Sequence, residues 1–170
     1  MPASYKPSPE HPLSPAFPYF PPEEQAWLQS ELSDILNSRL SMGPRVARFE
    51  QEFAEYCGAV YGVAFPSCTA ALESALAALG VGVGDEVLVP VETFVATGMG
   101  VHLAGGNPVF TEISGDTFSM DFEDAWSRIT DRTRGAIVVH FGGNIAPEFP
   151  GFVQRMHSTG RFVIEDAAHA

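Results

Sequence analysis

The chain has 170 residues, of which 45% are hydrophobic, and its 21 acidic and nine basic residues give a formal net charge of −12. This length predicts one compact α/β domain, with enough apolar residues for a core and little room for a second domain. The charge excludes nucleic acid as a partner, because too few cations are present to replace the counterions of a phosphate backbone. We expect a cytoplasmic protein that neither contacts nor crosses a membrane, since no apolar run has the length of a span and the N-terminus does not resemble a signal peptide.

Cysteine and lysine usage narrows the chemistry further. Cys57 and Cys68 fit neither a disulfide framework nor the spacing of a zinc site, so the sequence predicts reduced cysteines and no metal. Eight of the nine basic residues are arginines, and the single lysine is Lys6. Any reaction that needs a lysine amine therefore has one candidate in this sequence.

Residues 1–22 contain eight of the 14 prolines and no periodic pattern. This composition predicts an extended arm outside the core. Two interpretations remain open for the arm, namely disorder and contact with a partner subunit, and the composition itself favours disorder.

The remaining chain comprises residues 23–170. Its first half predicts two helices, a strand and a third helix. The first helix covers 23–37. The second begins at Gly43–Pro44, has a buried stripe and ends at Gly58. The predicted buried stripe consists of Val46, Phe49 and Phe53. A short strand at 62–65 and an alanine-rich helix ending at Gly80 follow.

The second half alternates strands and helices. The expected strands are 86–90, 108–110, 136–140 and 162–164, and the expected helices are 93–104, one capped by Asp121, and 147–158. This alternation predicts a mostly parallel sheet covered by helices on both faces. Because ligands of such sheets lie at the carboxyl ends of the strands, the residues just after each strand are the candidate site.

Ser67-Cys68-Thr69-Ala70 follows the first expected strand and opens a helix. Backbone N–H groups and the helix dipole make such a position suitable for a phosphate group, the dipole contributing ~0.3–1 kcal/mol. The alternative is that Ser67 or Thr69 is only an N-cap. After the next strand comes Phe94, which suits either stacking on a flat ring or packing in the core, and core packing is the more frequent role of a phenylalanine at helical spacing.

The last two expected strands end in polar residues. His140 is interpreted as a hydrogen-bonded structural residue, and the glycines after it, Gly142 and Gly143, allow backbone to approach a ligand closely. Asp166 ends the final strand, where a buried carboxylate is costly unless it is paired. Three partners are open for it: an arginine, a metal ion, or a protonated ring nitrogen. The neighbouring Glu165 should point the other way.

Taken together, these strand ends resemble the DegT/StrS family of sugar aminotransferases, which are fold type I enzymes dependent on pyridoxal 5'-phosphate (PLP). The resemblance covers the chain from about Gly43 to Ala170, and six stretches in compatible order carry it. They are Gly43-Pro44 with Phe49-Glu50, Ser67 to Leu72, Ala78 to Val87, Thr93 to Thr97, Val139-His140 with Gly142, and Ile164 to Ala170. The resemblance implies the three-layer, mostly parallel sheet of a PLP-dependent transferase large domain, truncated, for residues 23–170.

The resemblance also implies roles for individual residues. Thr69 and Ala70 match residues that hold the cofactor phosphate, and Cys68 stands in the same loop where the family usually has glycine. Phe94 matches the aromatic residue that stacks on the pyridine ring. Asp166 matches the aspartate that pairs with the ring nitrogen, where it keeps that nitrogen protonated. His169 matches a residue that hydrogen-bonds near the ring hydroxyl.

The family's Schiff-base lysine lies downstream of the aspartate motif, and we therefore expect no catalytic residue within the chain. Lys6 is no substitute because it lies on the proline-rich arm. The small, substrate-binding domain is likewise expected beyond residue 170. The leading interpretation is a truncated aminotransferase; the alternatives are a cofactor-binding half of a split enzyme, which pairs with a chain carrying the lysine, and an inactive relic.

The resemblance implies that the complete enzyme moves an amino group from an amino acid, usually glutamate, to a keto-sugar nucleotide, in nucleotide-sugar biosynthesis for a polysaccharide or an antibiotic sugar. It also implies a homodimer, and some relatives of this fold perform dehydration instead. A nucleotide-binding domain that uses Gly80, Gly82 and Gly84 is a weaker alternative. Those glycines follow a helix and precede a strand, which is the reverse of a dinucleotide loop.

Overall fold

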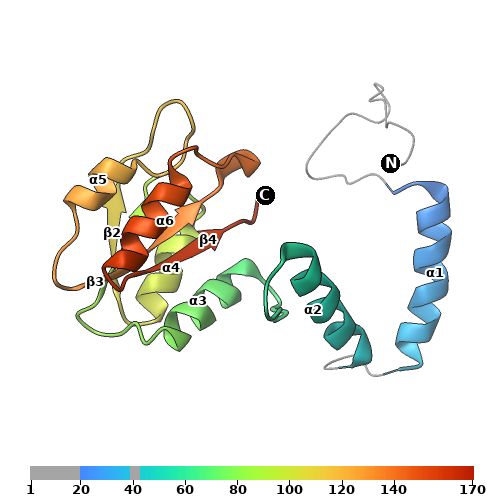
Figure 1. Ribbon diagram of the computed structural model, residues 1–170. Coiled ribbons are helices and arrows are strands. Elements are labelled where there is room, and N and C mark those ends of the chain that lie inside the picture. Colours follow the sequence, from blue (N-terminus) through green and yellow to red (C-terminus); the bar gives the residue numbers. More distant parts are fainter. Residues whose placement is uncertain (1–19, 39–42) are drawn as a thin grey trace. The chain divides into compact units, whose positions relative to one another are not determined.

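The computed structural model of the chain describes residues 20–38 and 43–170 (Figure 1). The chain separates into two compact units, Met1–Val63 and Ala64–Ala170. Lys6 and almost all of the expected N-terminal arm lie outside the described residues. Within those residues, no helix is long and apolar enough to cross a membrane.

The first unit contains helix α1, Pro22–Leu36, and helix α2, Pro44–Cys57. Both helices have proline in the first turn, where its missing N–H needs no acceptor. Helix α2 ends at Gly58, which takes the left-handed conformation with φ of 66°. The sequence therefore predicted both ends of α2 correctly.

The predicted buried stripe of α2 is wrong in this structure. Phe49 and Phe53 are 55% and 53% exposed, Val46 is also exposed, and Ala54 alone is buried among the residues of the helix. The two phenylalanine rings stack on each other, with centroids 5.6 Å apart. A helix buries an apolar stripe only against another element, and the described residues of Met1–Val63 supply no sheet for that purpose.

The strand expected at 62–65 is also wrong. These residues have no regular secondary structure, and Val63 and Phe65 are 69% and 42% exposed. The segment lies at the boundary between the two units. A strand needs a neighbouring strand for its N–H and C=O groups, and none of the described strands pairs with this segment.

The second unit is built on a parallel sheet of four strands in the order β2-β1-β3-β4. Helix α3 precedes the sheet, and α4, α5 and α6 connect its strands. Their bounds are α3 Cys68–Ala78, β1 Glu86–Pro90, α4 Val95–Leu103, β2 Asn107–Thr111, α5 Phe122–Ser127, β3 Thr133–Val139, α6 Phe149–Ser158 and β4 Phe162–Asp166. Apart from the strand at 62–65, the sequence placed every one of these elements.

Alternate residues of the central strands pack on opposite faces of the sheet. One face carries Val87, Val89 and Ile137 and is covered by α3 and α4. The other carries Leu88, Ala136 and Val138 and is covered by α5 and α6 (Figure 1). Two cores on either side of one parallel sheet make the three-layer α/β architecture that the sequence predicted.

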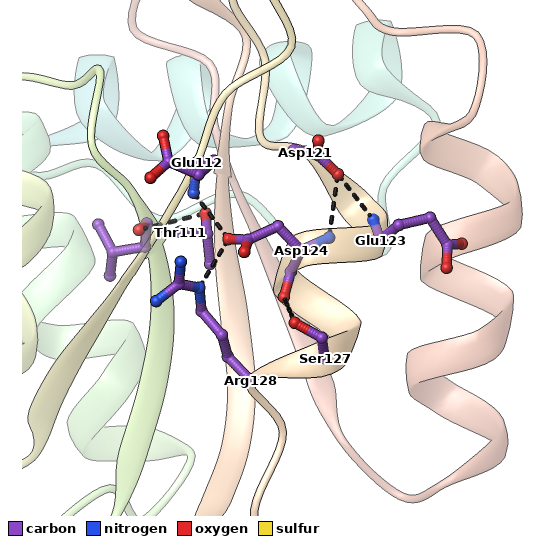
Figure 2. A network of polar contacts seen from close by, with 8 residues as sticks. Thr111, Glu112, Asp121, Glu123, Asp124, Ser127 and Arg128 are labelled. Atoms are coloured by element: carbon purple, nitrogen blue, oxygen red, sulfur yellow. Dashed lines mark hydrogen bonds and ion pairs between the residues drawn. The ribbon is translucent and has the colours of Figure 1, made fainter.

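The chain between β2 and α5 is held by two aspartates (Figure 2). Asp121 caps α5 as predicted, because its carboxylate accepts hydrogen bonds of 3.0 Å from the N–H groups of Glu123 and Asp124. The Asp124 carboxylate accepts from Arg128 Nε at 2.6 Å and from the Glu112 N–H at 2.8 Å. These donors, Arg128 first, lower the pKa of Asp124 below its ordinary value.

A further carboxylate, that of Glu86, lies at the amino end of the sheet. Glu86 begins β1 and is 7% exposed. It accepts a 2.5 Å hydrogen bond from the Thr130 hydroxyl and a 2.9 Å bond from Arg132 Nε. These two contacts lower the pKa of Glu86 below its ordinary value. The protein itself therefore supplies the cation that a buried carboxylate requires.

The glycine-rich segment before β1 is the predicted turn from helix to strand. Gly80 and Gly84 have φ of 74° and 93°, a conformation that favours glycine. Between them the Gly82 N–H donates to the Asp85 carboxylate at 3.1 Å. The turn lies at the amino end of β1, whereas a dinucleotide loop follows the carboxyl end of a strand. The nucleotide-binding alternative gains no support from this geometry.

Candidate cofactor site

The order of the strands creates a place where a ligand can bind. From β1 the chain moves outward to β2, then crosses to the other side of β1 to form β3 and β4. In parallel sheets, ligands lie outside the carboxyl ends of the strands where the order reverses in this way. That point lies between β1 and β3. Three of the residues expected at the site follow or end strands at the carboxyl end of the sheet, namely Phe94, Asp166 and His169.

Asp166 is the last residue of β4 and is 5% exposed. Its Oδ2 atom accepts a 2.9 Å hydrogen bond from the Thr97 hydroxyl, which belongs to the first turn of α4. Its Oδ1 atom accepts a 3.5 Å contact from the Cys68 thiol and a 3.3 Å bond from the Ala168 N–H. The carboxylate is thus held from three directions by α3, α4 and the turn after β4.

All of these donors are neutral. In the described part of the chain, no arginine, lysine or histidine side chain forms an ion pair with Asp166. Nor do the residues from 20–38 and 43–170 contain a group of three or more potential ligands arranged around a metal ion. An arginine partner and a metal partner are therefore not found there. The buried carboxylate still lacks the cation that would offset its desolvation.

Two threonines support Asp166: Thr97 in the first turn of α4, and Thr93 in the bend that precedes α4. Neither residue was expected at the site from the sequence. The Thr93 and Thr97 hydroxyls are 2.6 Å apart, and Thr97 is completely buried. The available signal was their spacing of four residues, which places side chains on one face of a helix, together with the neighbouring buried positions of α4. The sequence did not reveal that this face meets the end of β4, which lies 69 residues away along the chain.

At the start of α3, Ser67 is the N-cap, as one of the two open alternatives stated. Its hydroxyl accepts from the Ala70 N–H at 3.2 Å. The N–H groups of Cys68 and Thr69 point out of the first turn, where a helix offers no internal acceptor. Thr69 and Ala70 are partly buried. The helix start therefore keeps the geometry of an anion site while Ser67 fixes its first turn.

Cys68 lies between the helix start and Asp166. Burial, and after it the Asp166 charge, raise the pKa of the thiol above its ordinary value. A thiol with a raised pKa stays protonated and can donate to the carboxylate. From the sequence, Cys68 is only a larger residue where the family usually has glycine, and its contact with Asp166 spans 98 residues of the chain.

Phe94 does not pack in the core, contrary to the more frequent role of such a residue. It is 75% exposed and occupies the N-cap position of α4, three residues before Thr97. The Phe94 ring is therefore exposed to solvent at the carboxyl end of the sheet, where Asp166 also lies. This geometry is compatible with stacking on a ligand, the other alternative for this residue.

The two histidines at the carboxyl end of the sheet differ in burial and in hydrogen bonding. His140 is 2% exposed, its Nε2 lies 2.8 Å from Glu165 Oε2, and its ring edge meets Phe149. It is a hydrogen-bonded residue of the fold, as predicted, and the Glu165 side chain, 53% exposed, points away from the buried Asp166. His169 is exposed, and its Nδ1 accepts a 3.3 Å hydrogen bond from the Gly142 N–H.

Gly143 allows two stretches of backbone to approach each other. A Cβ atom at this position would lie 2.9 Å from the His169 carbonyl oxygen, and the residue has φ of 78°. From the sequence, Gly142 and Gly143 are expected to allow backbone to approach a ligand closely. In the structure, Gly143 instead admits the turn after β4, which carries His169.

The parallel sheet, the helices on both of its faces and the polar groups at the carboxyl ends of its strands define a three-layer α/β domain. The chain belongs to the DegT/DnrJ/EryC1/StrS aminotransferase family, which it matches over residues 22–170. It is 42% identical over 141 residues to the spore coat polysaccharide biosynthesis protein SpsC of Bacillus subtilis, and 40% identical over 131 residues to GDP-perosamine synthase of Caulobacter vibrioides. These alignments cover 82% and 76% of the chain.

A solved structure agrees with this family. The fold is similar to that of the PLP form of the putative sugar aminotransferase Spr1654 from Streptococcus pneumoniae, with a TM-score of 0.77, 29% identity and 91% of the chain covered. The chain spans 36%, 35% and 43% of the lengths of SpsC, GDP-perosamine synthase and Spr1654. The matched part is therefore considerably shorter than these relatives.

Proposed function

We propose that the chain is the N-terminal part of a PLP-dependent aminotransferase that acts on a keto-sugar nucleotide. The observation that carries this proposal is the buried Asp166 carboxylate, which has three neutral donors and no cationic partner among the described residues. A protonated ring nitrogen is the remaining partner of the three considered. The family membership and the sugar-related names of the relatives support the same reaction class.

The residues at the strand ends fit this cofactor. Cys68, Thr69 and Ala70 would receive its phosphate at the start of α3, where the helix dipole contributes ~0.3–1 kcal/mol. Phe94 would cover one face of the ring, and His169 would lie near the ring hydroxyl. When bound, PLP supplies the electron sink for the electrons released as the substrate's Cα proton leaves.

Asp166 has a defined task in this proposal. Its carboxylate would accept a hydrogen bond from the protonated ring nitrogen and would hold the proton there, because a buried negative charge strongly favours the cationic form of a neighbouring base. Thr97, Cys68 and the Ala168 N–H hold the carboxylate in one orientation through hydrogen bonds to its two oxygens. Burial of Asp166 keeps competing water away from this contact.

For the whole protein we propose a proline-rich arm at 1–22, followed by residues 23–170 as the N-terminal part of the cofactor-binding large domain. The Schiff-base lysine and the small domain would lie further along a longer chain, and the active enzyme would be a cytoplasmic homodimer. The amino donor would be an amino acid such as glutamate. A split half that pairs with a lysine-bearing chain, a relic, and a sugar dehydratase are the alternatives.

Titration of the chain with PLP tests the cofactor proposal. We expect weak, reversible and saturable binding, detected by absorbance and by calorimetry. Residues 64–170 contain no lysine, so borohydride should trap no covalent adduct in that unit. Absence of binding, or a reducible adduct mapped to residues 64–170, would contradict the proposal. Sequencing the gene past codon 170 separates the truncated-enzyme interpretation from the split-half and relic alternatives.

A further inference from the structure

The Thr97 side chain lies between two other polar groups in the interior of the second unit. It is 0% exposed, and its Oγ1 atom lies 2.9 Å from Asp166 Oδ2 and 2.6 Å from Thr93 Oγ1. Thr93 is partly buried and lies in the bend just before α4, four residues ahead of Thr97 in the first turn of that helix. The three groups form a short chain of hydrogen bonds that ends on the carboxylate.

The direction of these bonds follows from counting protons. An ionised carboxylate only accepts hydrogen bonds, and a hydroxyl has one proton to donate. The Thr97 proton is therefore directed to Asp166. The Thr93 hydroxyl must then donate to Thr97. Hydrogen bonds to a charged acceptor are stronger than neutral ones, and a donor behind Thr97 polarises it further.

The position of the Thr97 hydroxyl is restricted. Threonine is branched at Cβ and has few χ1 rotamers in a helix, and the Thr97 side chain is completely buried. Thr97 holds Oδ2 from α4, while Cys68 and the Ala168 N–H hold Oδ1 from the other side. Fixing both oxygens fixes the plane of the carboxylate.

We infer that Thr97 is a positioning residue, supported by Thr93, that orients the Asp166 carboxylate toward the ring nitrogen of the bound cofactor. This inference rests on the proposed function, since it takes Asp166 to be the partner of that nitrogen. A positioning role of Thr97 differs from a purely structural role in its effect on ligand binding. Loss of the Thr97 hydroxyl should weaken binding of a ring that has the nitrogen, and should not affect a ring that lacks it.

The test compares two ligands on the 170-residue chain. One is PLP, and the other is 1-deazapyridoxal 5'-phosphate, in which a C–H replaces the ring nitrogen. We expect the unmodified chain to prefer PLP, and Thr97→Val, which keeps the shape of the side chain, to reduce that preference about three- to tenfold. Thr97→Ser retains the hydroxyl and should restore most of the preference.

Matched variants separate positioning from folding. Thr111→Val removes another completely buried threonine hydroxyl, which contacts the Val89 carbonyl at 3.5 Å, and should leave the preference unchanged. Thermal unfolding is measured for every variant. If Thr97→Val does not fold, Thr93→Val takes its place in the test, with a smaller loss of preference expected because it removes only the supporting donor.

The outcomes distinguish this inference from the proposed function. If Asp166→Asn abolishes the preference for PLP but folded Thr97→Val keeps it in full, Thr97 does not position Asp166 and the inference is overturned. If the unmodified chain does not bind PLP, or binds both ligands equally, both the inference and the pairing of Asp166 with the ring nitrogen are overturned. Loss with valine and recovery with serine supports both.

Discussion

Two carboxylates are buried to nearly the same extent at opposite ends of the sheet, and their surroundings differ. Glu86, at the amino end of β1, is 7% exposed and Asp166, at the carboxyl end of β4, is 5% exposed. Glu86 forms an ion pair with Arg132 and accepts a hydrogen bond from the Thr130 hydroxyl. Asp166 accepts only from a hydroxyl, a thiol and a backbone N–H.

Under the proposed function, this difference separates a carboxylate that stabilises the fold from one that binds a ligand. A buried carboxylate that loses its hydration needs a cation or several donors in compensation. The fold supplies the cation at Glu86, so that group is complete without a ligand. It supplies orientation but no cation at Asp166. Burial is therefore a poor guide to a site unless the charge of the neighbours is considered with it.

The largest effect that would sharpen this comparison is expected from Asp166→Asn. The variant should bind PLP more weakly by ~2–3 kcal/mol, a loss on the order of 30- to 150-fold, because the charge-assisted bond to the ring nitrogen is removed. The unfolding free energy of the ligand-free chain should change by less than about 1 kcal/mol, since the loss of a charged acceptor for three donors is offset by removal of a buried charge that has no cationic partner among the described residues. Calorimetric titration and urea unfolding measure the two effects. Unchanged PLP affinity would break the assignment of Asp166.

Glu86→Gln should show the opposite behaviour. It leaves Arg132 without its carboxylate and should lower the unfolding free energy by ~1–2 kcal/mol, with PLP affinity unchanged. Glu123→Gln is the matched control, because the Glu123 side chain is 87% exposed in its pair with Arg155 and should contribute less than about 0.5 kcal/mol. A variant as stable as the unmodified chain would show that the Arg132 pair adds nothing to the fold.

The pH dependence of stability should follow Glu86. Its pKa is lower in the folded protein than in the unfolded chain, so its contribution is present above the ordinary glutamate pKa of about 4.3 and is lost as pH falls through the folded value. Urea unfolding from pH 7 to pH 3 should therefore show the unmodified chain and Glu86→Gln converging in the acid range. A stability difference between the two that stays constant over this range would contradict the depressed pKa.

The smallest effect is expected from Phe94→Ala. Loss of the exposed ring should weaken PLP binding by about 1 kcal/mol, roughly fivefold, and should not affect folding stability, because Phe94 is 75% exposed. Phe110→Ala is the control, since this residue is 49% exposed on the edge strand β2. Equal PLP affinities of the two variants would remove Phe94 from the site.

The parts of the fold that depend on local chemistry were predictable from the sequence. Pro44 and Gly58 define the two ends of α2, and Asp121 caps α5, because each of these residues acts within a few positions of itself. The strand at 62–65 and the stripe of Phe49 and Phe53 were predicted wrongly. Both require a partner element that is distant in sequence, and apolar periodicity indicates the need for a partner without providing one.

The candidate site likewise contains residues that were predictable from the sequence and residues that were not. Asp166 was found because a carboxylate at the end of a buried strand is unusual in any context, and the resemblance indicated its partner. Thr97 and Cys68 were not recognised as its donors. Their contacts with Asp166 span 69 and 98 residues, and only the packing of α3 and α4 against β4 brings the groups together. The roles of Thr69, Phe94 and His169 at a cofactor remain predictions.

The two edges of the described sheet differ in their ability to accept a further strand. Strand β2 forms one edge and contains Pro108, which has no N–H to donate, so a ladder added along that edge would be interrupted. Strand β4 forms the other edge and has no proline between Phe162 and Asp166. Among the described strands, self-association by backbone pairing is therefore disfavoured at β2 and open at β4, on the strand that ends in Asp166.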